Sequence, residues 1–373
     1  MKNILIFADY LPNEGWGGGV IIRSLTKDYP QGIKLFWTTF NTSGANRENT
    51  CNGIEILDFQ PKYIRGTGIS SIILKAEAEK FARSFNKLLA QHQVDLVWII
   101  IGKSYLNLYK VNRLSGKLNV PFHVTVHDDP ILEMPENKKL KAKKLFEEVL
   151  SRASSIDVIS SRMQTHYKQE FNVNSMVITR CIPEDFPENN KIVKDKINIL
   201  MGGYGNASEP WPLPLLEALE NLNKTIPCQI HLFDSKLKKY ESSGVKVHDL
   251  VDEQSFNAIL STTNIGYACD DLKPENAEFA KLSLPTKVIT YIGAGIPFLY
   301  HGPLDSTVGD LLKQFETGII VETNNPHDIL RGFFTLVSNY DYYQGNCRLA
   351  KQKLFSRKVV QEFFFRNVMQ SLN

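Results

Sequence analysis

Short apolar runs alternate with helical patterns along most of the chain, and this feature restricts the possible folds more than any other. In the first half the expected strands are residues 4–8, 33–39, 54–59, 96–101, 122–126 and 155–160. The expected helices are residues 20–29, 69–91, 137–152 and 162–171. Such alternation favours a parallel sheet covered by helices on both faces. The first half is therefore predicted to be an α/β domain.

The alternation stops at CIPEDFPENNKIVKDK (residues 181–196), whose prolines, paired asparagines and dense charge are typical of a linker. It then restarts. The second-half strands are expected at residues 197–201, 228–233, 245–248, 265–268, 296–300 and 318–321. The helices are expected at residues 213–222, 254–260, 285–292, 305–314 and 326–338, with two more within 340–373. The last, 358–372, has an aromatic face that must be buried.

The length of 373 residues agrees with two domains, at ~150 residues per domain. We predict an N-terminal domain over 1–182, a linker over 183–196, a C-terminal domain over 197–345 and C-terminal helices over 346–373. The last of these helices is expected to pack back on the N-terminal domain. The fold class is α/β, with two such domains.

Composition excludes several function classes. Hydrophobic residues make up 43% and charged residues 22%, which is ordinary for a globular protein. The net charge of +3 is too small to indicate nucleic-acid binding. Five scattered cysteines favour a reducing compartment and show no metal-ligand spacing. The first apolar run is too short for a signal sequence, and no run is long enough to span a membrane, so a cytoplasmic protein is expected.

The segment KLSLPTKVITYIGAGIPFLY (residues 281–300) reads as a loop, a short helix and a strand. Pro285 suits a helix start, and Gly293 and Gly295 suit its end. The free amides of that helix start, with Lys287 in its first turn, are a suitable site for an anion such as phosphate. The alternative is a solvated lysine on a helix whose glycines only act as caps.

The glycines of GWGGG follow the first expected strand as a loop before the first helix. The pattern is neither GxGxxG nor a P-loop. Gly17, Gly18 and Gly19 allow the backbone to approach a ligand closely, or they form a flexible turn. Trp16 at the tip covers a sugar or packs internally.

Other polar residues have two interpretations each. His127 and Asp128 end an expected strand, on the edge where parallel sheets bind ligands, although a lone histidine is often structural. The lysine-rich helix 138–152 is either a solvated face or a contact for anionic lipid at the inner face of a membrane. Asp270 and Asp271 are expected in a solvated loop, and do not form a convincing metal-ligand set.

With its strand-end His-Asp, its glycine loop and its tail helix, the chain resembles glycosyltransferases of the GT-B fold, and within these glycosyltransferase family 4. The most specific segment is SLPTKVITYIGAGIPFL, which is similar to the family's Pro-x-Lys, Tyr and Gly-x-Pro signature. The resemblance implies two Rossmann-like domains facing each other across a cleft. The second domain holds a sugar nucleotide, the first offers the acceptor, and the tail helix returns to the first domain.

The resemblance also assigns roles. It implies that the glycine loop approaches the donor phosphate and the acceptor, and that His127 contacts the transferred sugar, with Asp128 beside it. It places Val251 near the nucleobase. The remaining donor-side residues implied by the resemblance are Gly203, Tyr204, Ser283, Thr286, Lys287 and Thr290.

Two features of the family pattern are absent. The paired glutamates, of which the second holds the ribose hydroxyls, correspond to Leu282 and Thr290. The Arg and Lys that neutralise the diphosphate correspond to Tyr204 and Pro210. Charge compensation then falls on Lys287, on the helix N-terminus and on Lys281 or Arg180.

The resemblance implies transfer of a sugar from a UDP-, GDP- or dTDP-sugar of undetermined base to a glycan or lipid-linked hydroxyl in surface-polysaccharide biosynthesis. Because members of glycosyltransferase family 4 retain the anomeric configuration, the resemblance implies retention. No metal or other cofactor is expected, because preorganised amides and a lysine can stabilise the leaving diphosphate. Asp128 or Asp9 is the candidate base if the reaction inverts. The alternatives are a GT-B-fold sugar-nucleotide epimerase or hydrolase, and a catalytically silent nucleotide-sugar-binding or scaffold subunit.

Overall fold

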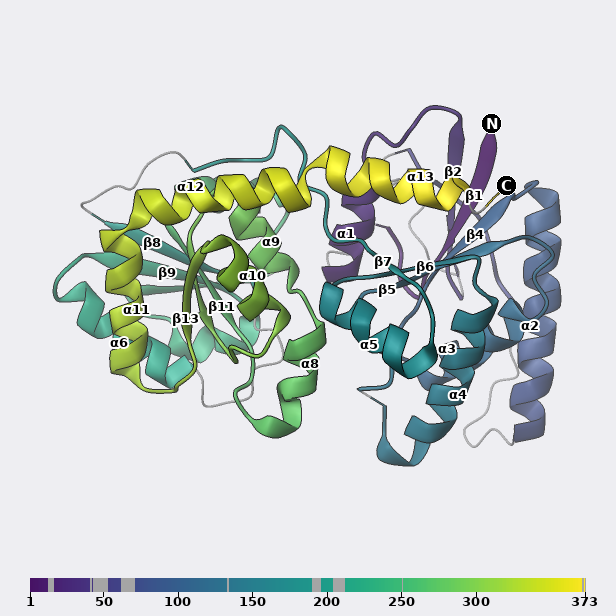
Figure 1. The fold of residues 1–373 in the computed structure, drawn as a ribbon, viewed down its shortest axis with the longest axis horizontal. Coiled ribbons are helices and arrows are strands. Elements are labelled where there is room, and N and C mark those ends of the chain that lie inside the picture. The colour runs from purple at the N-terminus through teal and green to yellow at the C-terminus, as the bar shows by residue number, and fades with distance from the viewer. Residues whose placement is uncertain are drawn as a thin grey trace. The chain divides into compact units, whose positions relative to one another are not determined.

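The computed structural model describes residues 1–12, 17–40, 42, 53–61, 71–132, 134–189, 196–203, 212–249, 251–370 and 372. The chain divides into two compact units. The first unit comprises Met1–Arg180 and Val360–Asn373, and the second comprises Cys181–Val359. Each contains its own sheet, and each is described by itself below (Figure 1).

All strand pairings in the first unit's described sheet are parallel. Its strands are β1 (Lys2–Phe7), β2 (Ile33–Thr38), β3 (Glu55–Ile56), β4 (Leu96–Ile100), β5 (Phe122–Val126), β6 (Ser155–Val158) and β7 (Met176–Val177). Its helices are α1 (Gly17–Thr26), α2 (Ser71–Gln91), α3 (Tyr105–Ser115), α4 (Glu136–Arg152), α5 (Ser161–Phe171) and α13 (Phe363–Gln370). Helices cover both faces of this sheet, so a strand such as β4 is buried along its whole length (Figure 1).

The second unit repeats this plan, again with parallel pairings throughout its described sheet. Its strands are β8 (Ile197–Met201), β9 (Cys228–Phe233), β10 (Val245–His248), β11 (Ile265–Cys269), β12 (Phe298–His301) and β13 (Gly318–Val321). Its α-helices are α6 (Pro212–Asn223), α7 (Glu253–Thr262), α8 (Ala277–Leu282), α9 (Thr286–Gly293), α10 (Thr307–Phe315), α11 (Pro326–Ser338) and α12 (Tyr340–Ala350). The shorter helical turns are η1 (Ser235–Tyr240), η2 (Pro274–Asn276), η3 (Lys351–Phe355) and η4 (Lys358–Glu362), the last of which continues into the first unit. The predicted α/β class is confirmed.

Strand order determines where each unit can bind a ligand. In the described residues the first sheet runs β3-β2-β1-β4-β5-β6-β7 and the second runs β10-β9-β8-β11-β12-β13. The order reverses between β1 and β4 in the first sheet, and between β8 and β11 in the second. At such a reversal the flanking connections leave in opposite directions, which opens a crevice at the carboxyl ends of the two strands.

Several elements differ from the sequence expectation. The glycines 17–19 form the first turn of α1 and not a loop before it. Apolar periodicity does not mark such a helix start, because glycine has no side chain. No element was expected at α3, which Ser104 caps by accepting from the Asn107 amide, or at α8. In the division into two units, residues 346–359 belong to the second unit.

Candidate functional site

At the β1–β4 reversal of the first sheet, Asp9 follows β1 and Gly102 follows β4. A Cβ atom on Gly102 would lie 2.0 Å from Oδ2 of Asp9, so the carboxylate fills the space that a side chain at position 102 would need. Desolvation raises the pKa of the Asp9 carboxyl, and a hydrogen bond from Asn107 opposes that change. A carboxylate is therefore held at the ligand-binding edge of the first sheet.

His127 lies beside this reversal, directly after β5, and its ring contacts the start of α1. A Cβ atom on Gly18 would lie 2.9 Å from Nδ1 of His127 and 3.3 Å from the Tyr10 hydroxyl, so only glycine fits there without displacing the ring. Burial lowers the pKa of His127, although Asp157 and Asp128 oppose this. Its Nε2 is buried and has no hydrogen-bond partner among the described residues. A neutral imidazole with an unused nitrogen is the result.

Asp128 points to a different partner. Its Oδ2 lies 3.3 Å from Nζ of Lys103, in an ion pair that is partly exposed. The structure thus places His127 against Gly18, while the neighbouring carboxylate binds a lysine. The roles predicted for His127 and Asp128 stay predictions.

At the β8–β11 reversal of the second sheet, Lys287 of α9 extends over the end of β8. The side chain is only 9% exposed, and its Nζ donates to the Gly203 carbonyl at 3.2 Å. Gly203 has a φ of +87°, a conformation that glycine adopts without strain. Within the described part of the chain, Lys287 forms no ion pair with a carboxylate.

Tyr291, one turn further along α9, fixes the helix to the sheet. Its hydroxyl accepts from the Gly202 amide at 2.9 Å and lies 3.0 Å from the carbonyls of Leu200 and Tyr267, one of which accepts its proton. Gly266 is required here, because a Cβ atom would lie 2.4 Å from the Tyr291 ring. These contacts set the position of the helix start, where Pro285 is the N-cap and provides no side-chain hydrogen bond.

The other predicted donor-side residues occupy varied environments. Ser283 is buried between α8 and α9. Thr290 is buried, and its Oγ1 donates to the Thr286 carbonyl at 2.8 Å within α9. Val251 is half-buried just before α7. Tyr204 and Pro210, like Gly15 and Trp16, lie outside the described residues.

The expectation of a solvated loop at Asp270 and Asp271 is wrong. These residues are only 7% and 8% exposed, directly after β11, where the chain turns toward η2. The Asp271 carboxylate holds that turn by accepting from the Lys273 amide at 3.0 Å and the Asn276 side chain at 2.8 Å. Asp270 accepts from the Tyr300 hydroxyl at 2.9 Å. The sequence signal was available: two acids directly after an apolar strand.

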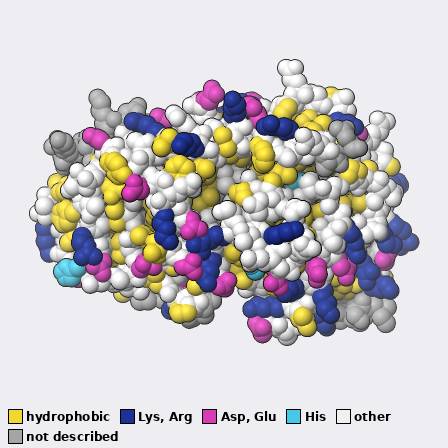
Figure 2. Space-filling model, in the orientation of Figure 1, with side chains coloured by type: hydrophobic (Ala, Val, Ile, Leu, Met, Phe, Trp, Pro, Cys, Tyr) yellow, Lys and Arg dark blue, Asp and Glu magenta, His cyan; other side chains and the backbone are white. Residues whose placement is uncertain are grey.

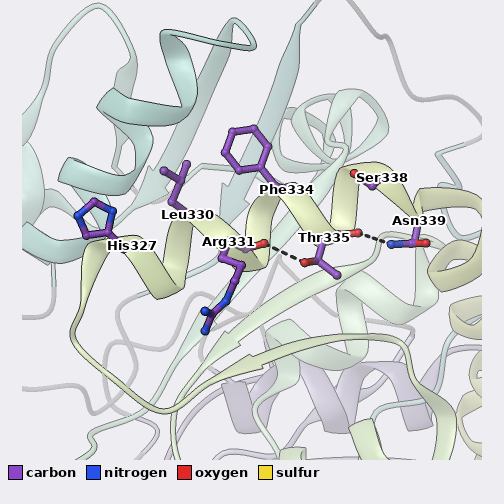
Figure 3. Close-up of a pocket in the computed structure, with 7 residues that line it drawn as sticks. All are labelled: His327, Leu330, Arg331, Phe334, Thr335, Ser338 and Asn339. Carbon is purple, nitrogen blue, oxygen red and sulfur yellow. Dashed lines mark hydrogen bonds between the residues drawn. The ribbon is translucent and has the colours of Figure 1, made fainter.

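A pocket of about 370 Å³ lies elsewhere, along the outer side of α11. Figure 3 shows its lining side chains spread along this one helix, with Thr335 and Asn339 hydrogen-bonded to carbonyls one turn earlier. Arg331, the charged side chain there, pairs with Asp328 at 2.9 Å. The pocket contains no strand end and offers no converging polar groups, so it does not have the features of a sugar-nucleotide site.

The described residues contain neither a cluster of metal ligands nor a helix that could span a membrane. No three His, Cys, Asp or Glu side chains gather there as ligands of a metal ion would. No helix in the same residues has the length and apolar character needed to cross a membrane.

Comparisons with known proteins find the same fold. A sucrose-phosphate synthase from Thermosynechococcus elongatus matches with a TM-score of 0.72 at 13% identity, covering 99% of both chains. A glycosyltransferase from Rickettsia africae matches with a TM-score of 0.70 at 14% identity, covering 100% of this chain and 99% of the other. HepE of Anabaena, solved in complex with UDP, matches with a TM-score of 0.70 at 12% identity, covering 99% and 100%.

No protein-family model matches the sequence, and no curated protein matches it either. At such low identities the structural likenesses establish the fold and nothing finer. The chain therefore has the fold of the GT-B glycosyltransferases, two parallel-sheet α/β domains.

Proposed function

We propose that this protein is a glycosyltransferase that moves a sugar from a nucleoside-diphosphate sugar to a hydroxyl of a glycan or lipid-linked acceptor, in the biosynthesis of surface polysaccharide or a related glycoconjugate. The fold supports this proposal, since HepE of Anabaena, solved with UDP and with UDP-glucose, shares it. The finer statements, which are retention, independence of metal and cytoplasmic location, belong to the same proposal.

The observation that carries the proposal is Lys287. A buried ammonium group is costly unless it is compensated. Lys287 has a hydrogen bond to one neutral carbonyl and no direct ion pair among the described residues, which compensates its charge only in part. An anionic ligand at the β8–β11 reversal supplies the missing charge, and the start of α9 adds free amides. A diphosphate fits both. In the proposed reaction these groups stabilise the leaving diphosphate, whose oxygen accepts the proton of the attacking acceptor hydroxyl on the same face of the sugar.

His127 is proposed to contact the transferred sugar. Its neutral ring keeps one nitrogen buried and unpaired, and that nitrogen can exchange a hydrogen bond with a sugar hydroxyl. Gly17, Gly18 and Gly19 at the start of α1 are proposed to approach the donor phosphate. Gly203, Ser283 and Thr286 are proposed to bind the donor as well. Tyr204 and Val251 complete the proposed donor side.

The lysine-rich helix α4 is proposed to contact an anionic membrane surface. Lys139, Lys143 and Arg152 pair with acidic side chains, so they contribute little free charge. Lys141 and Lys144 are exposed and form no ion pair within the described chain, and Leu140 beside them is 69% exposed. Figure 2 shows basic side chains gathered at the end of α4 that lies at the bottom of the view. Basic residues around an exposed leucine are suited to anionic headgroups.

Calorimetric titration with UDP, GDP and dTDP tests the proposal. Saturable binding of at least one nucleotide is expected. Lys287→Ala should weaken that binding by about 10- to 100-fold, because a charge-assisted hydrogen bond is worth about 1.5–3 kcal/mol. Lys313→Ala, which removes an exposed lysine of α10 in the same unit, should leave binding unchanged.

Turnover separates the proposal from its alternatives. With a labelled sugar nucleotide and a panel of glycan and lipid-linked acceptors, His127→Ala is expected to reduce transfer more than donor binding. Conversion of the sugar nucleotide alone to an isomer or free sugar would instead identify an epimerase or hydrolase. Absence of any saturable nucleotide binding would identify a silent scaffold.

A further inference from the structure

Three buried polar side chains meet around the carboxyl ends of β8, β11 and β12. They are Lys287, Asp270 and Tyr300, and each is less than a tenth exposed. Because the strand order reverses between β8 and β11, Asp270 and the carbonyl that receives Lys287 lie on opposite sides of the crevice that such a reversal opens.

Asp270 is held in a fixed orientation. Its amide donates to the His301 carbonyl at 3.0 Å, and its Oδ2 accepts from the Tyr300 hydroxyl at 2.9 Å. The Tyr300 ring packs closely against Gly302. A Cβ atom at this position would lie 2.5 Å from the ring, so any larger residue would displace it. A carboxylate with both its backbone and one oxygen fixed is preorganised to bind a ligand.

The carboxylate and the ammonium influence each other without forming an ion pair. Burial raises the pKa of Asp270, whereas the charge of Lys287 and the Tyr300 hydrogen bond lower it. No salt bridge joins Asp270 to Lys287 in the described residues. Two buried charges of opposite sign that do not pair directly are costly, and a ligand with an anionic part and hydroxyl groups would satisfy both.

In the resemblance to glycosyltransferase family 4, Leu282 and Thr290 correspond to the paired glutamates. Leu282 is buried and apolar, and the Thr290 hydroxyl donates to its own helix. We propose that Asp270 binds hydroxyl groups of the nucleotide sugar, on its ribose or on its transferred sugar, beside a diphosphate held at Lys287. This inference rests on the proposed function.

Calorimetry with Asp270→Asn distinguishes the two sources of hydroxyl groups. The ligands are UDP or GDP, whichever binds the wild type better, its dideoxy counterpart without ribose hydroxyls, and its glucose conjugate. If Asp270 binds the ribose, the variant should lose about tenfold or more in affinity for the ribonucleotide and nothing for the dideoxy form. If it binds the transferred sugar, only the affinity for the glucose conjugate should fall.

Asp271→Asn is the matched control, because both oxygens of this neighbouring buried carboxylate accept hydrogen bonds from the local turn. Its ligand preferences should equal those of the wild type. Tyr300→Phe removes the hydrogen bond that orients Asp270 and keeps the carboxylate. It should lower the affinity for the same ligands as Asp270→Asn does, but by less. If Asp270→Asn does not fold, Tyr300→Phe replaces it in the same measurements.

Equal affinities of wild type and folded Asp270→Asn for all three ligands would overturn the role of Asp270 while leaving the proposed function intact. If Asp270→Asn does not fold, equal affinities of wild type and Tyr300→Phe for all three ligands would overturn the role of Asp270 in the same way. If the wild type binds no nucleoside diphosphate at all, both the proposed function and this role are refuted. The two failures are thus distinguishable.

Discussion

His231 and His248 face each other from neighbouring strands β9 and β10. Their rings stack with centroids 5.1 Å apart at an angle of 9°, and Nδ1 of His231 lies 2.9 Å from Nε2 of His248. This hydrogen bond needs one donor and one acceptor, so both rings cannot be protonated without opposing two N–H groups. Burial, His248, Lys246 and Lys196 together lower the pKa of His231 to about 4.

This pair predicts a pH-dependent stability. In the unfolded chain His231 titrates near its ordinary pKa of about 6.5, so between about pH 4 and 6.5 the unfolded state binds more protons than the folded state. The free energy of unfolding should therefore fall as the pH is lowered through this window. Urea unfolding at a series of pH values measures it, and His231→Gln should flatten the dependence. An unchanged slope in that variant would contradict the assignment.

At the scale of elements, α13 closes the first core over a buried polar network. Phe364 is fully buried, with its ring 4.5 Å from that of Trp98 and 5.4 Å from that of His123. Beneath it, His123 hydrogen-bonds to Asp157, and Thr125 donates to the same carboxylate at 2.6 Å. The helix therefore excludes water from a buried ionisable pair as well as from apolar side chains.

Phe364→Ala should destabilise the first unit by about 3–5 kcal/mol, because it leaves a cavity against Trp98. Thermal or urea unfolding followed by tryptophan fluorescence measures this. Phe363→Ala is the matched control: this side chain is 38% exposed on the same helix, and the change should stay within about 0.5 kcal/mol. Equal losses in both variants would show that the helix does not act through Phe364.

Helix α4 gives a second prediction at this scale. Lys141→Gln with Lys144→Gln should weaken binding to vesicles that contain phosphatidylserine by about 2 kcal/mol, or about 30-fold, at ~1 kcal/mol per basic residue. Flotation at low salt, with phosphatidylcholine vesicles as the blank, measures it. Lys80→Gln with Lys87→Gln removes the same charge from α2 and should have little effect. If the wild type does not float, α4 is only a solvated face.

At the scale of the whole molecule, nucleotide binding should protect the chain unequally. Hydrogen exchange with saturating nucleoside diphosphate should slow most at residues 201–203, 266–271 and 285–291, which surround the β8–β11 reversal. Lys287→Ala should remove most of the protection at the same nucleotide concentration. Protection confined to the first unit would contradict a donor site in the second.

The fold class was predictable because it depends on local pattern. Runs such as residues 4–7 and 96–100 contain the apolar side chains that a buried parallel strand needs, and the structure places strands at these positions. Helix α3 was missed, although Ser104 caps it, and α1 begins three residues earlier than expected. These differences occur where a terminus depends on capping and not on apolar periodicity.

The sequence by itself determined that the chain forms two parallel α/β sheets, and it singled out Lys287 and His127. Only the tertiary structure decided what surrounds them. That Asp270 is buried beside β8, that Lys287 meets the Gly203 carbonyl and that Gly18 touches His127 all depend on strand order and helix placement. The physical reason is that each of these contacts joins segments far apart in the chain, and no local pattern records which strand ends will be neighbours.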